Sequence, residues 1–144
     1  MMKLAGFSMV ELMVVIVIIG ILGSFAIPAY QEHIVKAKVM ELFAMVQPAK
    51  LAVTEALING KALETITQES LGLGENEGAG GNINRISVLN GIITVTGNSQ
   101  ALGLGNEPLA ITFTPRQQGG VIAWACSTIP AEKRKYTPSS CHAE

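Results

Sequence analysis

The feature that most constrains this chain is an uncharged run of twenty residues near its start, from Leu12 to Gln31. At a rise of about 1.5 Å per residue, a helix of this length spans roughly 30 Å, the thickness of the hydrocarbon core of a bilayer. The chain has 144 residues, enough for one domain of ordinary size, and 49% of them are hydrophobic. A single membrane-spanning segment is therefore the first prediction.

A secretory signal peptide is the alternative for this segment, because it has a positive start, an apolar core and small residues at positions 24 and 26 that resemble a cleavage site. The apolar core, however, is longer than the usual limit of about 15 residues, and Glu11 places an acid where signal peptides normally have none. Apolar residues also continue at helical spacing beyond the run: Val35, Val39, Leu42, Val46, Ala49, Val53 and Leu57. We therefore expect one helix of about fifty residues, whose second half lays an apolar stripe on a globular body.

Two prolines interrupt this helical pattern. Pro28 lacks the N–H that would bond to the carbonyl of Ser24, and a proline in a helix interior costs about 3 kcal/mol. We expect the helix to bend or weaken there, although a tolerated transmembrane proline accounts for Pro28 equally well. Pro48 predicts a second, gentler kink at Ala44.

The helical pattern gives way to turn and loop signals after Ile58. The pair Asn59-Gly60 predicts the end of the helix, and residues 63–73 predict a short helical turn. Residues 71–82 are rich in glycine, but no strand precedes them and no helical pattern follows. We interpret this segment as a mobile connector and not as a phosphate-binding loop.

From Arg85 onward, apolar and polar residues alternate as in strands. The pattern predicts four strands: 86–89, 92–95, 109–114 and 121–126. Asn90-Gly91 lies between the first two and is a strong hairpin signal. A sheet with one apolar face needs a cover, and the helical stripe is the one available. We predict an α+β fold in which a long N-terminal helix packs on a four-stranded antiparallel sheet, with Trp124 in or beside the core and not in a binding site.

The two cysteines indicate the compartment. Cys126 and Cys141 are separated by fourteen residues and have no metal-ligand spacing, so a disulfide is favoured over two free thiols. Closing a loop of about 15 residues stabilises a fold by roughly 3 kcal/mol and requires an oxidising space, the periplasm or the cell exterior. Within this loop we expect Lys133, Arg134 and Lys135 to be exposed, where a partner can reach them.

The sequence gives little evidence of a catalytic site. The only histidines are His33 and His142, aspartate is absent, and no nucleophile-elbow, Walker or zinc-protease pattern occurs. We predict that the chain is not an enzyme and uses no cofactor or metal. Its net charge of −1 also excludes binding of anionic surfaces by bulk charge.

The stretch from Gly6 to Glu11, followed by this apolar run, resembles the type IV prepilin signature. The resemblance implies that a leader of residues 1–6 is removed after Gly6 and that Phe7 becomes a methylated N-terminus. It further implies a transmembrane and filament-core helix over residues 7–30 and a head domain over residues 31–144. Pro28 and Pro48 fall where the long pilin helix has its kinks, and a disulfide loop closes the chain as in pilins.

In this family the acid at the Glu11 position pairs with the N-terminal amine, here that of Phe7, of a neighbouring subunit. Lateral packing of the helices from Met9 to Ala29 would supply most of the adhesion. The resemblance implies a structural subunit of a type IV pilus that serves adhesion, twitching motility or DNA uptake. The implied partners are further copies of the chain, the prepilin peptidase and the inner-membrane assembly machinery, with a host surface or DNA left open. The implied location is the inner membrane, with the head in the periplasm, and then the extracellular pilus.

Two alternatives remain open at this stage. A pseudopilin of a type II secretion system shares the leader and helix, but major pseudopilins typically carry an acid-rich calcium loop near the C-terminus, where this chain has a basic, cysteine-closed loop. A bitopic binding module that never polymerises is the alternative from another class of protein.

Overall fold

This computed structural model describes residues 6–74 and 76–142, with only the backbone for residues 76–80. The chain divides into two compact units, Met1–Ile34 and Val35–Glu144. The units are therefore described separately, and residues 1–5 of the expected leader lie outside the described part of the chain.

The long helix α1 runs from Met9 to Ile58, which confirms the predicted helix of about fifty residues. It stays helical through Pro28 and Pro48, and the predicted kinks at these positions remain predictions. In the first unit, every described residue from Gly6 to Ile34 is exposed except Gly23, which is partly exposed. Among the described residues, α1 is the one helix long and apolar enough to cross a membrane.

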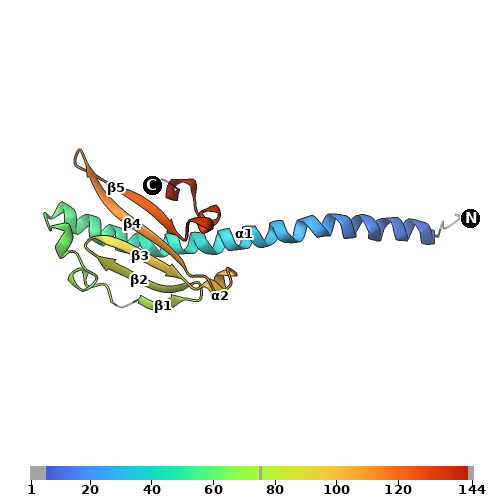
Figure 1. Cartoon of the computed structure of the whole chain (residues 1–144), viewed down its shortest axis with the longest axis horizontal. Helices are drawn as coiled ribbons and strands as arrows, with labels where there is room; N and C mark the ends of the chain where they lie inside the picture. The colour runs from blue at the N-terminus through green and yellow to red at the C-terminus, as the bar shows by residue number, and fades with distance from the viewer. Residues whose placement is uncertain (1–5, 75, 143–144) are drawn as a thin grey trace, which may run out of the picture. The chain divides into compact units, whose positions relative to one another are not determined.

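The second unit contains an antiparallel sheet in the order β1-β2-β3-β4-β5 (Figure 1). Its strands are β1 (Asn76–Gly80), β2 (Ile83–Leu89), β3 (Ile92–Gly97), β4 (Leu109–Gln118) and β5 (Val121–Ile129). The last four confirm the four predicted strands, each somewhat longer than the sequence pattern indicated. Asn90 and Gly91 have φ angles of 51° and 71°, as a type I′ turn requires, and join β2 to β3 as predicted.

The interpretation of residues 71–82 as a mobile connector is wrong for its second half. Residues Asn76–Gly80 form β1 and pair antiparallel with β2, with Asn76 opposite Ile86 and Glu77 opposite Arg85. Backbone groups make these pairs, so the unpaired edge of β2 can recruit a glycine-rich segment whose side chains favour no strand. The sheet therefore has five strands and not four.

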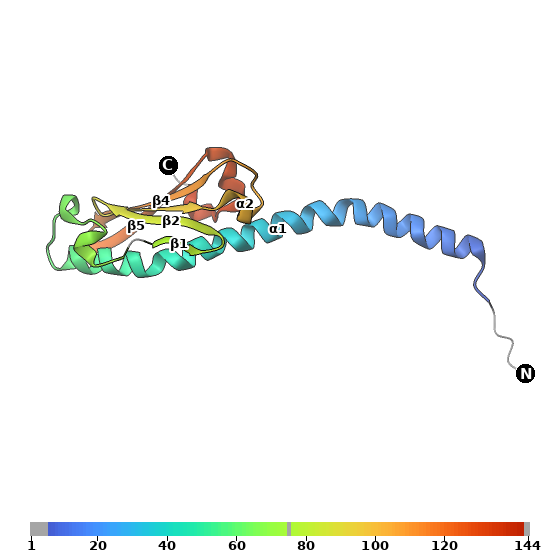
Figure 2. The ribbon, with the colours of Figure 1, turned by 90° about the horizontal axis from the view of Figure 1, so that it is seen from below.

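The core lies between the sheet and the part of α1 within the second unit (Figure 2). The helix contributes Val39, Leu42, Val46, Ala49, Val53 and Ala56, all at most 6% exposed. The facing sheet residues include Ile93, Val95, Leu109, Ile111 and Phe113. The predicted stripe is thus confirmed, with Val35 and Leu57 packed at its two ends and only partly buried.

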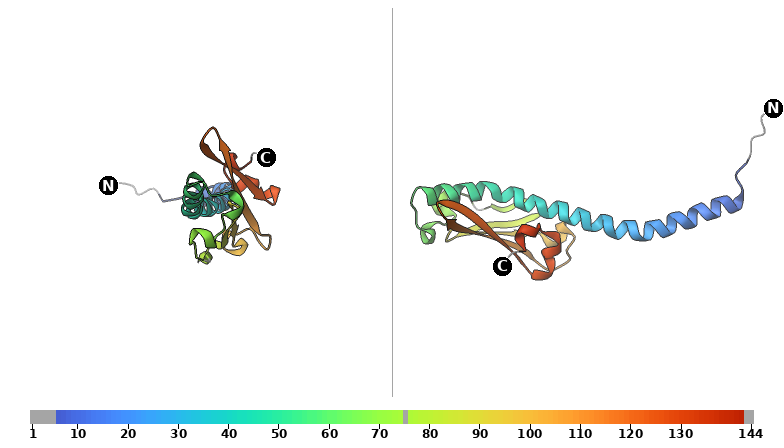
Figure 3. Two further views of the ribbon diagram at one scale, coloured as in Figure 1. Left: turned by 90° about the vertical axis from the view of Figure 1, so that its left-hand side faces the viewer. Right: turned by 90° about the horizontal axis from the view of Figure 1, so that it is seen from above.

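Short turns connect these elements. Helix α1 ends at Ile58 and Gly60 has a φ of 81°, as Asn59-Gly60 predicted. The predicted helical turn appears as two 3-10 turns, Leu63–Thr65 and Glu69–Leu71. The short helix α2 (Ser99–Leu102), which the sequence pattern did not indicate, is capped by the side chain of Asn98. After β5 the chain forms two further 3-10 turns, Ala131–Tyr136 and Ser139–Cys141, which lie beside β5 (Figure 3).

Candidate assembly site and the disulfide-closed loop

Glu11 lies in the first turn of α1, where its carboxylate interacts with the start of the helix. Its Oε2 atom accepts a hydrogen bond from the backbone N–H of Ser8 at 3.5 Å, and the Ser8 Oγ atom accepts one from Val10 N–H at 3.3 Å. This arrangement is a variant of the capping box, in which the glutamate bonds back to the serine N–H while the serine hydroxyl accepts from the N–H two residues later and not three. The sequence signal for this cap is Ser8-x-x-Glu11, directly before the apolar run.

Gly6 and Phe7 precede the helix in a non-helical, exposed segment. The Phe7 side chain is 83% exposed, and a Cβ atom added at Gly6 would meet nothing within 4 Å. The peptide bond between these residues therefore lies in an exposed, non-helical segment. Cleavage there would place a new amine one residue before the capping box, four residues from Glu11.

The helical surface that follows is apolar over its whole circumference. Large apolar side chains between Leu12 and Tyr30 are exposed within this unit, and Phe25 and Tyr30, the latter with a hydroxyl at its tip, are 75% and 68% exposed. A contiguous apolar surface of this size is not stable in water, so it must be covered by lipid or by another protein. The hydroxyl of Ser24, one turn before Pro28, bonds back to the carbonyl of Ile21 at 2.7 Å.

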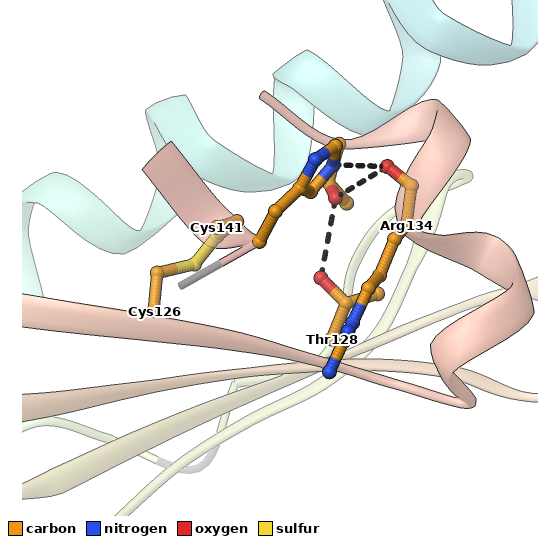
Figure 4. The surroundings of a disulfide bond; sticks show 6 residues. Cys126, Thr128, Arg134 and Cys141 are labelled. Carbon is orange, nitrogen blue, oxygen red and sulfur yellow. Dashed lines mark hydrogen bonds between the residues drawn. A yellow bond between two sulfur atoms is a disulfide. The ribbon is translucent and has the colours of Figure 1, made fainter. Parts of the chain in front are cut away.

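Cys126 in β5 and Cys141 in the last 3-10 turn form the predicted disulfide (Figure 4). A second set of contacts closes the same loop. The carbonyl oxygen of Arg134 accepts hydrogen bonds from the Thr137 hydroxyl at 2.9 Å and from His142 Nε2 at 2.6 Å. The buried hydroxyl of Thr128 on β5 lies 3.2 Å from that of Thr137. The loop is therefore attached to β5 by polar contacts as well as by the covalent bond.

The expectation that Lys133, Arg134 and Lys135 are all exposed is wrong for the first two. The Lys133 side chain is only 15% exposed and its Nζ lies 3.0 Å from Glu107 Oε2. The Nε atom of Arg134 is buried and has no hydrogen-bond partner among the described residues. Only Lys135 is exposed, with its Nζ 4.9 Å from the centre of the Tyr136 ring. Long basic side chains can bury their stems against a core, and the helical turn directs two of the three inward.

A lysine on α1 is part of an aromatic cluster that the sequence did not reveal. Lys50 Nζ lies 3.9 Å from the centre of the Phe113 ring and 5.6 Å from that of Trp124. Burial lowers the pKa of the Lys50 ammonium, while the negative face of the ring attracts it. Phe43 packs edge-on against Phe113, and Trp124 packs partly buried against the core, as predicted.

The described histidine, cysteine and acidic side chains do not form a metal site. Within residues 6–74 and 76–142, no group of three or more His, Cys, Asp or Glu side chains is placed to hold a metal ion. His33 is exposed on α1, and His142 is exposed on the loop and contacts Arg134.

Comparison with known proteins gives two matches to protein families and a set of similar chains. Residues 35–142 match the family described as Pilin (bacterial filament), and residues 1–27 match the prokaryotic N-terminal methylation motif. The type IV major pilin protein PilE1 of Neisseria gonorrhoeae is 34% identical over 84% of this chain and 68% of its own length. Fimbrial protein EcpC of Eikenella corrodens is 32% identical over 94% of this chain and 89% of its own length. Fimbrial protein Q of Moraxella bovis is 31% identical over 94% of this chain and 96% of its own length.

Proposed function

Because this chain belongs to the bacterial pilin family and is a structural subunit of a type IV pilus, we propose that α1 is both its membrane anchor and its assembly element. The observation that carries this proposal is the exposed apolar surface of residues 12–30, which contain no charged side chain. Lipid covers such a surface before assembly, and helices of neighbouring subunits cover it in a filament. The segment from Met9 to Ala29 would then form the filament core, and residues 31–144 the head.

Processing would precede assembly. A prepilin peptidase would cleave behind Gly6, and the amine of Phe7 would be methylated. The match of residues 1–27 to the methylation motif and the exposed, non-helical backbone at Gly6 support this step. Intact-mass measurement of the pilus subunit should give a chain that begins at Phe7 and carries one methyl group. A chain that retains Met1 or begins near Ile27 would contradict it.

Glu11 would guide the incoming subunit into register. In hydrocarbon an ionised carboxylate costs about 3 kcal/mol by insertion scales, so it needs a partner. After cleavage, the ammonium of Phe7 on a subunit already in the filament offers an opposite charge. Pairing between two copies sets their axial offset, because each helix carries one acid and one amine at fixed positions.

The head would lie in the periplasm before it reaches the cell exterior with the pilus. The disulfide between Cys126 and Cys141 supports this location, because such bonds persist in oxidising compartments. The membrane and the assembly machinery of the inner membrane would be partners during this stage. Lys135 remains as the exposed basic residue of the loop through which a surface or DNA could be contacted.

Electron microscopy of material sheared from the cell surface tests the proposal. We expect filaments that contain this chain, detected by an antibody against the head. A pseudopilus subunit would leave the sheared fraction without such filaments while secretion depends on the chain. A bitopic binding module would stay in the membrane fraction and form no fibre.

A further inference from the structure

An apolar groove runs along one side of α1 in the head unit, between the helix and β2. It has a volume of about 180 Å³. Its walls include Ala44, Met45, Pro48 and Ala49 from α1, with Ile86 and Val88 from β2. An apolar cavity of about 150 Å³ is large enough to bind benzene, so this groove has room for one six-membered ring.

The rim of the groove also carries a hydrogen-bond acceptor. Pro48 has no N–H, so the carbonyl of Ala44 lacks the donor that position i+4 supplies in an α-helix. Residues four apart share a helix face, and both Ala44 and Pro48 line the groove. Gln68, which also borders the groove, already donates its side-chain amide to the carbonyl of Gly74 at 2.8 Å. The groove thus combines apolar walls with a backbone carbonyl that lacks its helical donor, the surroundings that suit a phenol.

The chain itself contains a matching side chain. Of its two tyrosines, Tyr136 packs partly buried against the core, while Tyr30 is 68% exposed. The exposed phenylalanines, Phe7 and Phe25, have no hydroxyl to donate. Tyr30 and Ala44 are fourteen positions apart on one helix, too far for a side chain to reach back, so the tyrosine must come from another copy.

We propose that in the filament the groove holds the Tyr30 side chain of a second copy of this chain, with its hydroxyl donating to the carbonyl of Ala44. The proposal rests on the proposed function, since it needs subunits packed through α1. Exposed apolar side chains on either side of the groove along α1, Met40 and Leu51, make the same face suitable for a neighbouring helix. Before assembly, Tyr30 lies at the end of the apolar run, where tyrosines are common at a membrane surface. Tyr30 would thus lie at the membrane surface before assembly and in the groove after it, so the test must be made on filaments.

Methionine oxidation provides a readout within the parent chain. Met45 lines the groove and is 40% exposed, whereas Met40 on the same helix is 50% exposed and lies outside it. In parent filaments, Met45 should be oxidised several-fold more slowly than in detergent-solubilised monomers. Tyr30→Ala filaments should restore the rate at Met45 and leave that at Met40 unchanged, while Tyr30→Phe should retain much of the protection. Equal oxidation of Met45 in parent filaments and monomers would overturn the proposal.

A cysteine pair identifies the occupant. Filaments of the Tyr30→Cys, Ala44→Cys variant should form intermolecular disulfides under mild oxidation, seen as a ladder on a non-reducing gel. The matched control is Tyr30→Cys with Ile58→Cys, because Ile58 is 74% exposed at the end of the same helix and does not line the groove. An absent ladder, or an equal one in the control, would show that another segment covers the groove. If Tyr30→Ala does not form filaments, the oxidation rate of Met45 in parent filaments and the crosslinking of the Tyr30→Cys, Ala44→Cys variant still test whether Tyr30 occupies the groove. If the parent forms no filaments, the proposed function fails, whereas filaments with an accessible Met45 contradict only the docking of Tyr30.

Discussion

The carboxylate of Glu11 accepts a hydrogen bond from the backbone N–H of Ser8, with 3.5 Å between Oε2 and N. Before cleavage, the acid therefore has a partner within its own chain, at the end of a helix whose dipole favours negative charge. Removal of the leader would add an ammonium at Phe7, next to this cap. The proposed pairing between subunits must then compete with the cap, and it wins only where hydrocarbon raises the value of a full opposite charge.

The disulfide should account for a large part of the stability of the head. Replacing Cys126 and Cys141 together by Ser opens a loop whose closure is worth about 3 kcal/mol, so the free energy of unfolding should fall by about that amount. Chemical denaturation of the detergent-solubilised chain measures the change.

Alkylation provides the control for this prediction. Because Cys141 is only 1% exposed, labelling must be done in denaturant, where burial no longer protects a thiol. Two labels per chain should appear with reductant and none without it. Labelling in denaturant alone would mean that the cysteines are not paired in the protein.

Gly97 should tolerate no side chain. A Cβ atom at this position would lie 2.5 Å from Leu102 Cδ1 and 3.1 Å from Leu42 Cδ2, and both leucines are fully buried. Gly97→Ala should therefore lower the free energy of unfolding by about 1 to 3 kcal/mol, the usual cost of overpacking a core. Gly74→Ala is the matched control, since a Cβ there meets nothing within 4 Å. Equal denaturation midpoints for the two variants would be incompatible with the packing between α1 and α2.

Lys50 should make the stability of the head depend on alkaline pH. Its burial lowers the pKa in the folded head below the unfolded value, so the unfolded chain binds more protons between these two pKa values. The stability of the parent relative to Lys50→Met should therefore rise as the pH increases through that window. Lys61→Met, which removes an exposed lysine, controls for the general effect of alkaline pH. A difference between parent and Lys50→Met that stays constant up to about pH 10.4 would contradict the role assigned to burial.

The main elements could be predicted because their signals are local. The spacing of Val39, Leu42 and Val46 fixes both a helix and its buried face, and Asn90-Gly91 fixes a hairpin. Strand β1 could not be predicted, because its pairing depends on the free edge of β2 and not on its own side chains.

The functional residues also divide into those that a local motif predicts and those whose contacts depend on the fold. Glu11 was identified from its place in a motif, but its bond to Ser8 depends on where the helix begins. Lys133 lies in a charged run typical of a surface, and its contact with Glu107, twenty-six positions earlier, depends on the fold. Likewise, Lys50 approaches Phe113 and Trp124 only because α1 crosses β4 and β5. Contacts between residues far apart in the sequence leave no periodic trace from which they could be predicted.

The measurement that tests the central claim most directly compares the membrane-inserted and sheared-filament pools of the parent with those of Glu11→Ala and Glu11→Gln. Removing a charge from hydrocarbon saves about 3 kcal/mol on insertion scales, so both variants should enter the membrane at least as well as the parent and form the disulfide. Filaments should nevertheless fall steeply for Ala and recover little with Gln, because the ammonium of Phe7 then lacks its counter-charge. A normal filament yield from Glu11→Ala would contradict the proposed role of this carboxylate, and loss of the variant from the membrane pool would assign the acid to insertion or processing instead.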